Sequence, residues 1–245
     1  MGFIATIIIN MLASLLPLGY GNTGELSDAI PNLFVPIGLT FSIWGAIYFL
    51  LALFIIYQAR DIFKKDDEKI EMPFQDKISF FFILSSIANI TWIFLWHYKE
   101  IFWSLIAMLV LLISLLIIYL KLNIGKANVS KYEKIFVHLP FSVYLGWITV
   151  ATIANVTAVL VTFGVESFGL IAEIWTIIVI GVAVLITLLM LFIRKDIAYS
   201  AVVIWATLGI FLKQLTGDLI ISITALIVVI LLTIVTLFIL YKEYL

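Results

Sequence analysis

Two tryptophans and an asparagine share one face of a predicted helix. Asn89, Trp92 and Trp96 follow one another at offsets of three and four residues, so their side chains point to the same side. An asparagine inside a bilayer needs a partner, because an unsatisfied amide in hydrocarbon costs several kcal/mol. For Asn89 and Trp92 we therefore expect a polar anchor in a flat aromatic pocket. Trp96, and Trp103 beyond a short loop, are more typical of the aromatic belt at a membrane surface.

Trp44 and Trp147 form a second candidate pair. Trp44 lies about two helical turns past Gly38, so it should point deeper into the membrane than a belt residue. A lone tryptophan in a membrane helix otherwise contributes to packing or to the belt. Asn155 lies near Trp147 in the sequence and could donate or accept hydrogen bonds across helices, while the small residues around it favour close helix approach.

The residue inventory gives no sign of catalysis. There is no cysteine, and the two histidines, His97 and His138, are too far apart to suggest a metal centre. No nucleophile has an evident base, which argues against a conventional enzyme. A net charge of −1 gives no indication of nucleic acid binding. We therefore expect no catalytic residues, no metal, no cofactor and no nucleic acid partner.

Composition indicates an integral membrane protein. Of the 245 residues, 64% are hydrophobic and 12% are charged, about half the 25% that is usual in soluble domains. Lipid must therefore be the solvent for most of the chain. A spanning helix needs about 20 apolar residues. Eight runs qualify, at residues 3–20, 38–59, 78–97, 101–121, 135–162, 169–193, 197–214 and 219–241. The expected fold class is all-α, a polytopic bundle of about eight transmembrane helices.

The basic residues predict the orientation. Twelve of the 14 lysines and arginines fall in alternate loops, whereas Lys99 and Lys213 fall on the other side. The positive-inside rule then places both termini in the cytoplasm, and we expect a multi-pass protein of a bacterial-type plasma membrane. On the opposite side, the segment 21–37 is longer than a connection requires. It is either a lid over a cavity or a solvated linker.

Three sequence blocks carry a resemblance to a known family. The first, "NLFVPIGLTFSIWGAIYFLL", has Phe34, Pro36, Gly38, Phe41, Trp44, Ile47 and Tyr48 at the positions of a proline–glycine turn followed by an aromatic helix. The second, "ANITWIFLWHYKEIFWSLIAMLVLL", contains Asn89 and Trp92 in register. The third, "YLGWITVATIANVTAVL", contains Trp147, Ala151, Thr152 and Asn155. In this order the blocks resemble the TspO/translocator family, the tryptophan-rich sensory proteins. The chain departs from the family pattern at Phe34, which replaces a tryptophan, and at Ile37, which replaces a proline.

The resemblance implies a domain division and a ligand. It covers residues 1–162, a TspO-like five-helix bundle, and leaves 163–245 as a three-helix C-terminal extension of unknown role. It implies a porphyrin or other tetrapyrrole, or a sterol-like lipid, as the ligand, and a homodimer as the assembly. Weak porphyrin breakdown is conceivable by the same resemblance. The residues implied in ligand binding are Phe34, Pro36, Gly38, Phe41, Trp44, Tyr48, Asn89, Trp92, Trp147, Thr152 and Asn155.

Three functional hypotheses remain open at this point. In the first, the chain is a receptor or sensor that binds a flat hydrophobic ligand in a tryptophan-lined cavity. In the second, it is a secondary transporter or permease, with Asn10, Asn89 and Asn155 as a polar set near the midplane. Glu173, just inside the sixth span, is a candidate for proton or cation coupling, although its place near the boundary also allows its carboxylate to reach water. A signalling or scaffold role for the extension is a third reading.

Overall fold

The computed structural model describes residues 19–61, 72, 74–164 and 171–244, and the elements in these ranges are helical. Seven helical segments among them are long and apolar enough to cross a membrane. Their bounds are Gly38–Ala59, Phe74–His97, Ile101–Lys121, Lys131–Thr162, Ala172–Arg194, Ile197–Gln214 and Leu219–Glu243. The multi-pass helical bundle expected from the sequence is thereby confirmed. The first expected span, 3–20, falls almost entirely outside the described residues.

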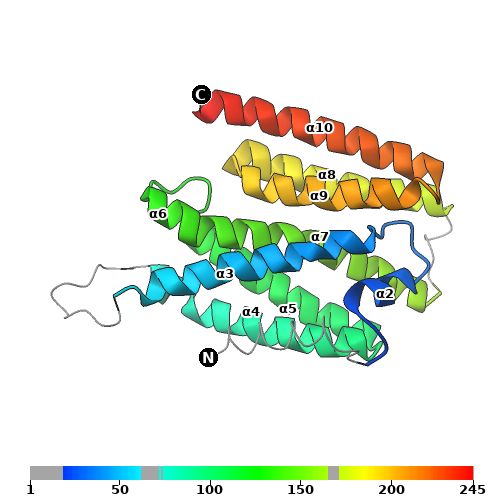
Figure 1. Cartoon of the computed structure of the whole chain (residues 1–245), viewed down its shortest axis with the longest axis horizontal. Helices are drawn as coiled ribbons and strands as arrows, with labels where there is room; N and C mark the ends of the chain where they lie inside the picture. Colours follow the sequence, from blue (N-terminus) through cyan, green and yellow to red (C-terminus); the bar gives the residue numbers. More distant parts are fainter. Residues whose placement is uncertain (1–18, 62–71, 73, 165–170, 245) are drawn as a thin grey trace.

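The helices lie lengthwise beside one another in layers (Figure 1). Helices α4 (Phe74–His97) and α5 (Ile101–Lys121) form a hairpin, and α5 packs against α7 (Leu139–Thr162). The next neighbour of α7 is α9 (Ile197–Gln214), and α9 in turn packs with α10 (Leu219–Tyr244). Helix α8 (Ala172–Arg194) lies with α9 between α7 and α10. Helix α3 (Ile43–Ala59) crosses α7. The segment with the short helix α2 (Thr23–Asp28) precedes α3 in the chain and lies at one end of the bundle.

Close contact between α7 and α9 depends on Gly146. A Cβ atom at this position would lie 3.2 Å from the Tyr199 carbonyl oxygen and 3.2 Å from the Val202 side chain. Small residues allow membrane helices to approach in this way. Helix α9, which follows residue 162 in the chain, is therefore packed directly on α7.

The Lys131–Thr162 segment contains a π turn near its start. A short helix α6 (Lys131–Glu133) leads into η3 (Lys134–His138), where the Leu139 backbone N–H bonds the Lys134 carbonyl five residues earlier. Pro140 follows immediately and has no N–H to donate to the carbonyl four residues before it, so the ordinary α-helical ladder is interrupted there. The sequence-based start at residue 135 was therefore several residues late.

The basic residues separate between the two ends of the bundle. One end carries Arg60, Lys77, Lys121, Lys126, Lys131, Lys134, Arg194, Lys195 and Lys242, and the other carries Lys99 and Lys213. The described helices thus place the basic residues as the alternation predicted. That the basic end is cytoplasmic remains a prediction of the positive-inside rule.

Candidate functional site

Trp44 is the centre of a cluster of aromatic rings. It stacks on Tyr48 at a centroid distance of 5.6 Å and lies 5.9 Å from Trp92. Trp147 meets it edge to face at 6.1 Å, and Tyr144 at 6.2 Å. These are the offset and edge geometries that aromatic rings prefer. The cluster joins α3, α4 and α7, and so unites tryptophans from all three sequence blocks.

Two further rings extend this cluster toward the end of the bundle. Trp96 stacks on Trp92 at 5.9 Å, and Phe41 meets Trp147 edge to face at 5.9 Å. Phe41 belongs to the 3-10 turn η1 (Gly38–Ser42), which brings the chain into α3. Trp44, Trp92, Trp96, Trp147 and Phe41 are named the indole cluster below.

Asn155 is the polar anchor of the indole cluster. Its side-chain oxygen accepts a hydrogen bond from the Trp92 indole at 3.1 Å, and its amide nitrogen donates to the Ser104 hydroxyl at 3.1 Å. The Ser104 hydroxyl in turn donates to the Ile101 carbonyl at 2.7 Å. Because an indole can only donate, the Asn155 oxygen must face Trp92, which fixes the orientation of the amide. This node joins α4, α5 and α7 inside the bundle.

Replacing Asn155 with alanine should remove both interhelical bonds and leave the Trp92 indole without its acceptor. We expect a loss of about 1–2 kcal/mol in the free energy of unfolding, because interhelical hydrogen bonds in membranes are individually modest but a buried orphaned donor adds its own cost. Denaturant unfolding in detergent measures the change. The matched control is Thr91→Ala, whose exposed hydroxyl donates to the Ile87 carbonyl of its own helix. Equal stability of the two variants would contradict the role assigned to Asn155.

Asn89 lies behind the indole cluster, beside the hydroxyl groups of Tyr48 and Tyr144. It is fully buried. These two neighbouring tyrosines come from α3 and α7.

A short helix covers the end of the indole cluster. Helix α2 (Thr23–Asp28) begins with a capping box, in which the Asn22 side chain accepts from the Glu25 N–H and the Glu25 carboxylate accepts from the Asn22 N–H, both at 3.0 Å. The Thr23 carbonyl accepts a hydrogen bond from the Trp96 indole at 3.4 Å. The segment 21–37 therefore lies against the cluster as a lid rather than extending as a solvated linker.

Helix α9 holds this lid from the other side. The Ile37 N–H donates to the Gly209 carbonyl at 3.1 Å, and the Gln214 amide donates to the Leu33 carbonyl at 3.0 Å. Lys213 forms an ion pair with Asp28 of α2. The Trp205 indole donates to the Thr40 carbonyl at 3.0 Å. A helix from the C-terminal third of the chain thus secures the segment that covers the candidate site.

The space among the rings is small in this conformation. The cavity has a volume of about 40 Å³ and is lined by Thr23, Ser27, Pro36, Phe41, Trp44, Trp92, Trp96, Trp147, Val150, Ala151, Ala154 and Asn155. One water molecule occupies about 30 Å³ of liquid. A groove of about 390 Å³ lies outside it along α2, and the two share Thr23, Phe41 and Trp44. These three residues separate the groove from the cavity.

The predicted ligand-binding residues divide into groups. The inner cavity is lined by Pro36, Phe41, Trp44, Trp92, Trp147 and Asn155. Gly38 lines the outer groove. Tyr48 stacks on Trp44, Asn89 is buried near Tyr48, and neither is among the residues that line the cavity. Phe34 is buried in the core, and the Thr152 hydroxyl bonds the Ile148 carbonyl, so neither lines the cavity. Ala151 takes the wall position next to Thr152.

The sequence did not identify Trp96, Thr23 and Ser27 as residues that line the cavity. It did place Trp103 correctly at the surface. Trp96 is only 6% exposed and lines the cavity, whereas Trp103 is 57% exposed as expected of a belt residue. Glu173 lies in the first turn of α8, where a carboxylate interacts favourably with the positive end of the helix. Asn10 lies outside the described residues. Thr23 and Ser27 of the lid carried no motif that could have identified them.

The sequence matches a protein-family model described as TSPO-like protein over residues 1–238. The match continues through α8 and α9 and most of α10, beyond the blocks that carried the resemblance. No curated protein and no solved structure gives a match. The aromatic blocks and the extent of this match lead to one conclusion: the chain belongs to the family of TSPO-like proteins.

Proposed function

We propose that this membrane protein is a receptor for a flat, largely apolar ligand, and that the ligand binds within the indole cluster. The observation that carries the proposal is the convergence of four tryptophans from α3, α4 and α7 on one cavity beneath α2. Indole faces bind flat apolar molecules by stacking, and ligand sites are commonly apolar with a few polar groups. A porphyrin or a sterol-like lipid has the required shape.

The polar groups of the cavity favour a ligand with a hydrogen-bond acceptor. Trp147 is 2% exposed, and no acceptor for its indole nitrogen lies among the residues that the structure describes. A buried donor without a partner is costly. A carbonyl or carboxylate oxygen on the ligand would remove that cost.

Binding requires the site to open. Ligand pockets for molecules of drug size have volumes of about 300–1,000 Å³, many times the cavity seen here. The outer groove meets the cavity at Thr23, Phe41 and Trp44. Movement of α2 together with these two rings would join the two spaces, so the described conformation is the closed form of the receptor.

Breaking the ion pair between Asp28 and Lys213 should speed ligand binding. Both side chains are partly exposed, and pairs of this kind contribute about 0.2–1 kcal/mol. We expect Asp28→Asn to raise the association rate about twofold to fivefold. Stopped-flow quenching of tryptophan fluorescence measures this rate. Lys213→Gln should have the same effect, and the double variant should add nothing further. An additive double variant would contradict a shared latch.

The test of the receptor function is a titration of the purified protein with protoporphyrin, read by quenching of tryptophan fluorescence. We expect saturable quenching, with a sterol competing if both ligands share the site. Absence of saturable quenching by either compound would overturn the proposal.

Transport is the alternative, and no contact in the site favours it. The amide of Asn155 is engaged with Trp92 and Ser104, and Glu173 lies at the end of α8 rather than near its middle. Counterflow of labelled porphyrin in liposomes distinguishes carriage from binding alone.

A further inference from the structure

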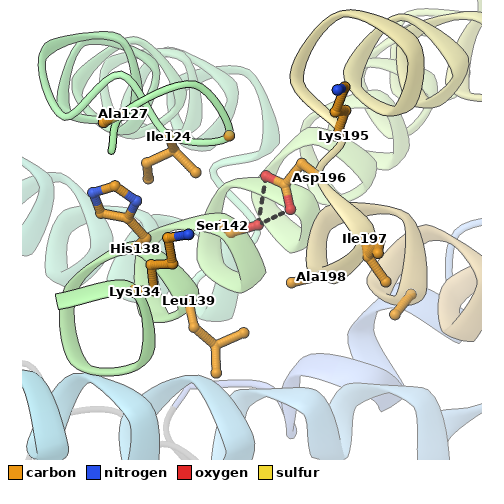
Figure 2. Close-up of a pocket in the computed structure, with 12 residues that line it drawn as sticks. Ile124, Ala127, Lys134, His138, Leu139, Ser142, Lys195, Asp196, Ile197 and Ala198 are labelled. Carbon is orange, nitrogen blue, oxygen red and sulfur yellow. Dashed lines mark hydrogen bonds between the residues drawn. The ribbon is translucent and has the colours of Figure 1, made fainter. Parts of the chain in front are cut away.

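A second pocket lies at the opposite, basic end of the bundle. It has a volume of about 350 Å³ and is enclosed by the loop after α5, the start of the Lys131–Thr162 segment and the junction of α8 with α9. Its polar lining residues are Lys134, His138, Ser142, Lys195 and Asp196 (Figure 2). It shares no residue with the indole cluster, so it is independent of the receptor function proposed above.

Three of these polar residues form a stripe. Lys134, His138 and Ser142 are spaced four residues apart, and the π turn η3 spans the first two. Single π turns inside helices occur frequently at functional sites. Figure 2 shows Lys134 and His138 on one wall of the pocket and Asp196 on the facing wall, with Ser142 between them.

Asp196 is a fixed structural group in this pocket. Its carboxylate accepts hydrogen bonds from the Ser142 hydroxyl at 2.5 and 2.6 Å, from the Tyr119 hydroxyl at 2.9 Å and from the Tyr199 N–H at 3.0 Å. These bonds cap α9 and join it to α5 and α7. With three donors already bound, the carboxylate has little remaining capacity for a ligand cation.

His138 is the group in the pocket that lacks a partner. It is 7% exposed, and its Nε2 atom has no hydrogen-bond partner among the residues that the structure describes. A buried polar atom in that state is costly unless a ligand or water meets it. Figure 2 shows the Lys134 ammonium on the same side, directed toward Ser142 and Asp196. Lys134 and His138 therefore both line the cavity from the start of the Lys131–Thr162 segment.

The surroundings of the pocket are basic. Lys126, Lys131 and Arg194 lie on the neighbouring segments, and Lys195 lines the pocket while pairing with Glu243 at 2.6 Å. Ile197 and Ala198 line it from the first turn of α9, the positive end of that helix. Basic pockets between membrane helices on the cytoplasmic side bind anionic headgroups.

We propose that this pocket binds a phosphate group, held by Lys134 and by His138 through Nε2. The apolar wall formed by Ile124, Leu139 and Ile197 suits the glycerol and first carbons of a phospholipid. The same chemistry would accept free phosphate, and the test separates the two sources.

The experiment uses the full chain in a maltoside detergent, which contains no phosphate. Native mass spectrometry measures binding of phosphatidylglycerol and of diacylglycerol with the same acyl chains, and calorimetry measures inorganic phosphate. We expect phosphatidylglycerol to bind at least about tenfold more tightly than diacylglycerol, because charge-assisted hydrogen bonds to the phosphate are strong. Displacement of the lipid by millimolar inorganic phosphate would identify free phosphate as a ligand. Failure of displacement would identify the lipid headgroup.

Matched variants locate the site. Lys134→Gln and His138→Leu should each weaken phosphatidylglycerol binding about tenfold, and Lys134→Arg should retain it. Lys131→Gln makes the same charge change at an exposed position outside the pocket and should stay within about twofold of the parent. Lys134 is exposed, so its substitution tests the site even if His138→Leu does not fold. Equal binding of the two lipids, or equal effects of Lys134→Gln and Lys131→Gln, would overturn the proposal.

Discussion

Replacing Gly209 with alanine is expected to displace the lid and weaken the bundle. A Cβ atom at Gly209 would lie 2.0 Å from the Thr40 hydroxyl and 2.8 Å from the Pro36 side chain. Thr40 is buried and Pro36 has a rigid ring, so neither moves away at small cost. Overpacking of this kind costs about 1–3 kcal/mol. The free energy of unfolding in detergent should fall, and the ligand dissociation constant should change because Pro36 lines the cavity.

Gly181 of α8 provides the matched control for this variant. Nothing lies within 4 Å of a Cβ atom built there, so Gly181→Ala gains helix propensity of about 1 kcal/mol without a clash. The two substitutions are chemically identical, but the free energy of unfolding should fall for Gly209→Ala and rise for Gly181→Ala. Equal stability changes at Gly209 and Gly181 would contradict the contact between α9 and the segment that enters α3.

Replacing both Trp44 and Trp147 with phenylalanine should weaken ligand binding by at least about tenfold. The change removes indole surface and the free Trp147 N–H, and aromatic contacts of this kind contribute about 0.5–1.5 kcal/mol each beyond the buried area. Folding should survive, because phenylalanine keeps an apolar ring in each position. Protoporphyrin titration, read by absorbance so that the loss of tryptophans does not affect the signal, measures the effect.

Trp103→Phe is the control for the double variant. Trp103 is exposed and lies outside the indole cluster, so its replacement should leave the dissociation constant unchanged. If Trp103→Phe and the double variant bind porphyrin with the same affinity, the indole cluster is not the binding site.

Much of the helical architecture followed from the sequence because the physics behind it is local. A bilayer requires continuous apolar runs bounded by charged residues, and the expected 197–214 span agrees with α9 residue for residue. The start of the Lys131–Thr162 segment was predicted too late, because the charged residues Lys131, Glu133 and Lys134 are typical of a loop. The structure shows them in helical turns that extend beyond the apolar run.

The candidate site was predicted less completely, for reasons of geometry. Neighbouring residues on a helix point about 100° apart, so the motif that contains Ala151 and Thr152 could not decide which of them faces the cavity. Trp96 precedes the charged turn after α4 and was taken as a belt residue, but the Thr23 carbonyl of the lid accepts its indole N–H. No local sequence pattern predicts that the Thr23 carbonyl is the partner of Trp96.

The role of α9 could not be predicted from single motifs. Leu33 and Gln214 are 181 residues apart in the sequence, and Thr40 and Trp205 are 165 apart. Such pairings depend on how complete helices pack. The predicted division into a 1–162 bundle and a 163–245 extension remains a statement about sequence resemblance, while in space α9 secures the lid of the candidate site.

The central claim is that a flat ligand reaches the indole cluster only when α2 moves away from α9. The chain has no cysteine, so Asp28→Cys and Lys213→Cys can be joined specifically by a short bis-methanethiosulfonate reagent and released by reduction. With the crosslink in place, porphyrin association measured by stopped-flow quenching should slow by at least about tenfold, equivalent to about 1.4 kcal/mol in the barrier, and it should recover after reduction. An association rate that is the same before and after reduction would contradict the claim.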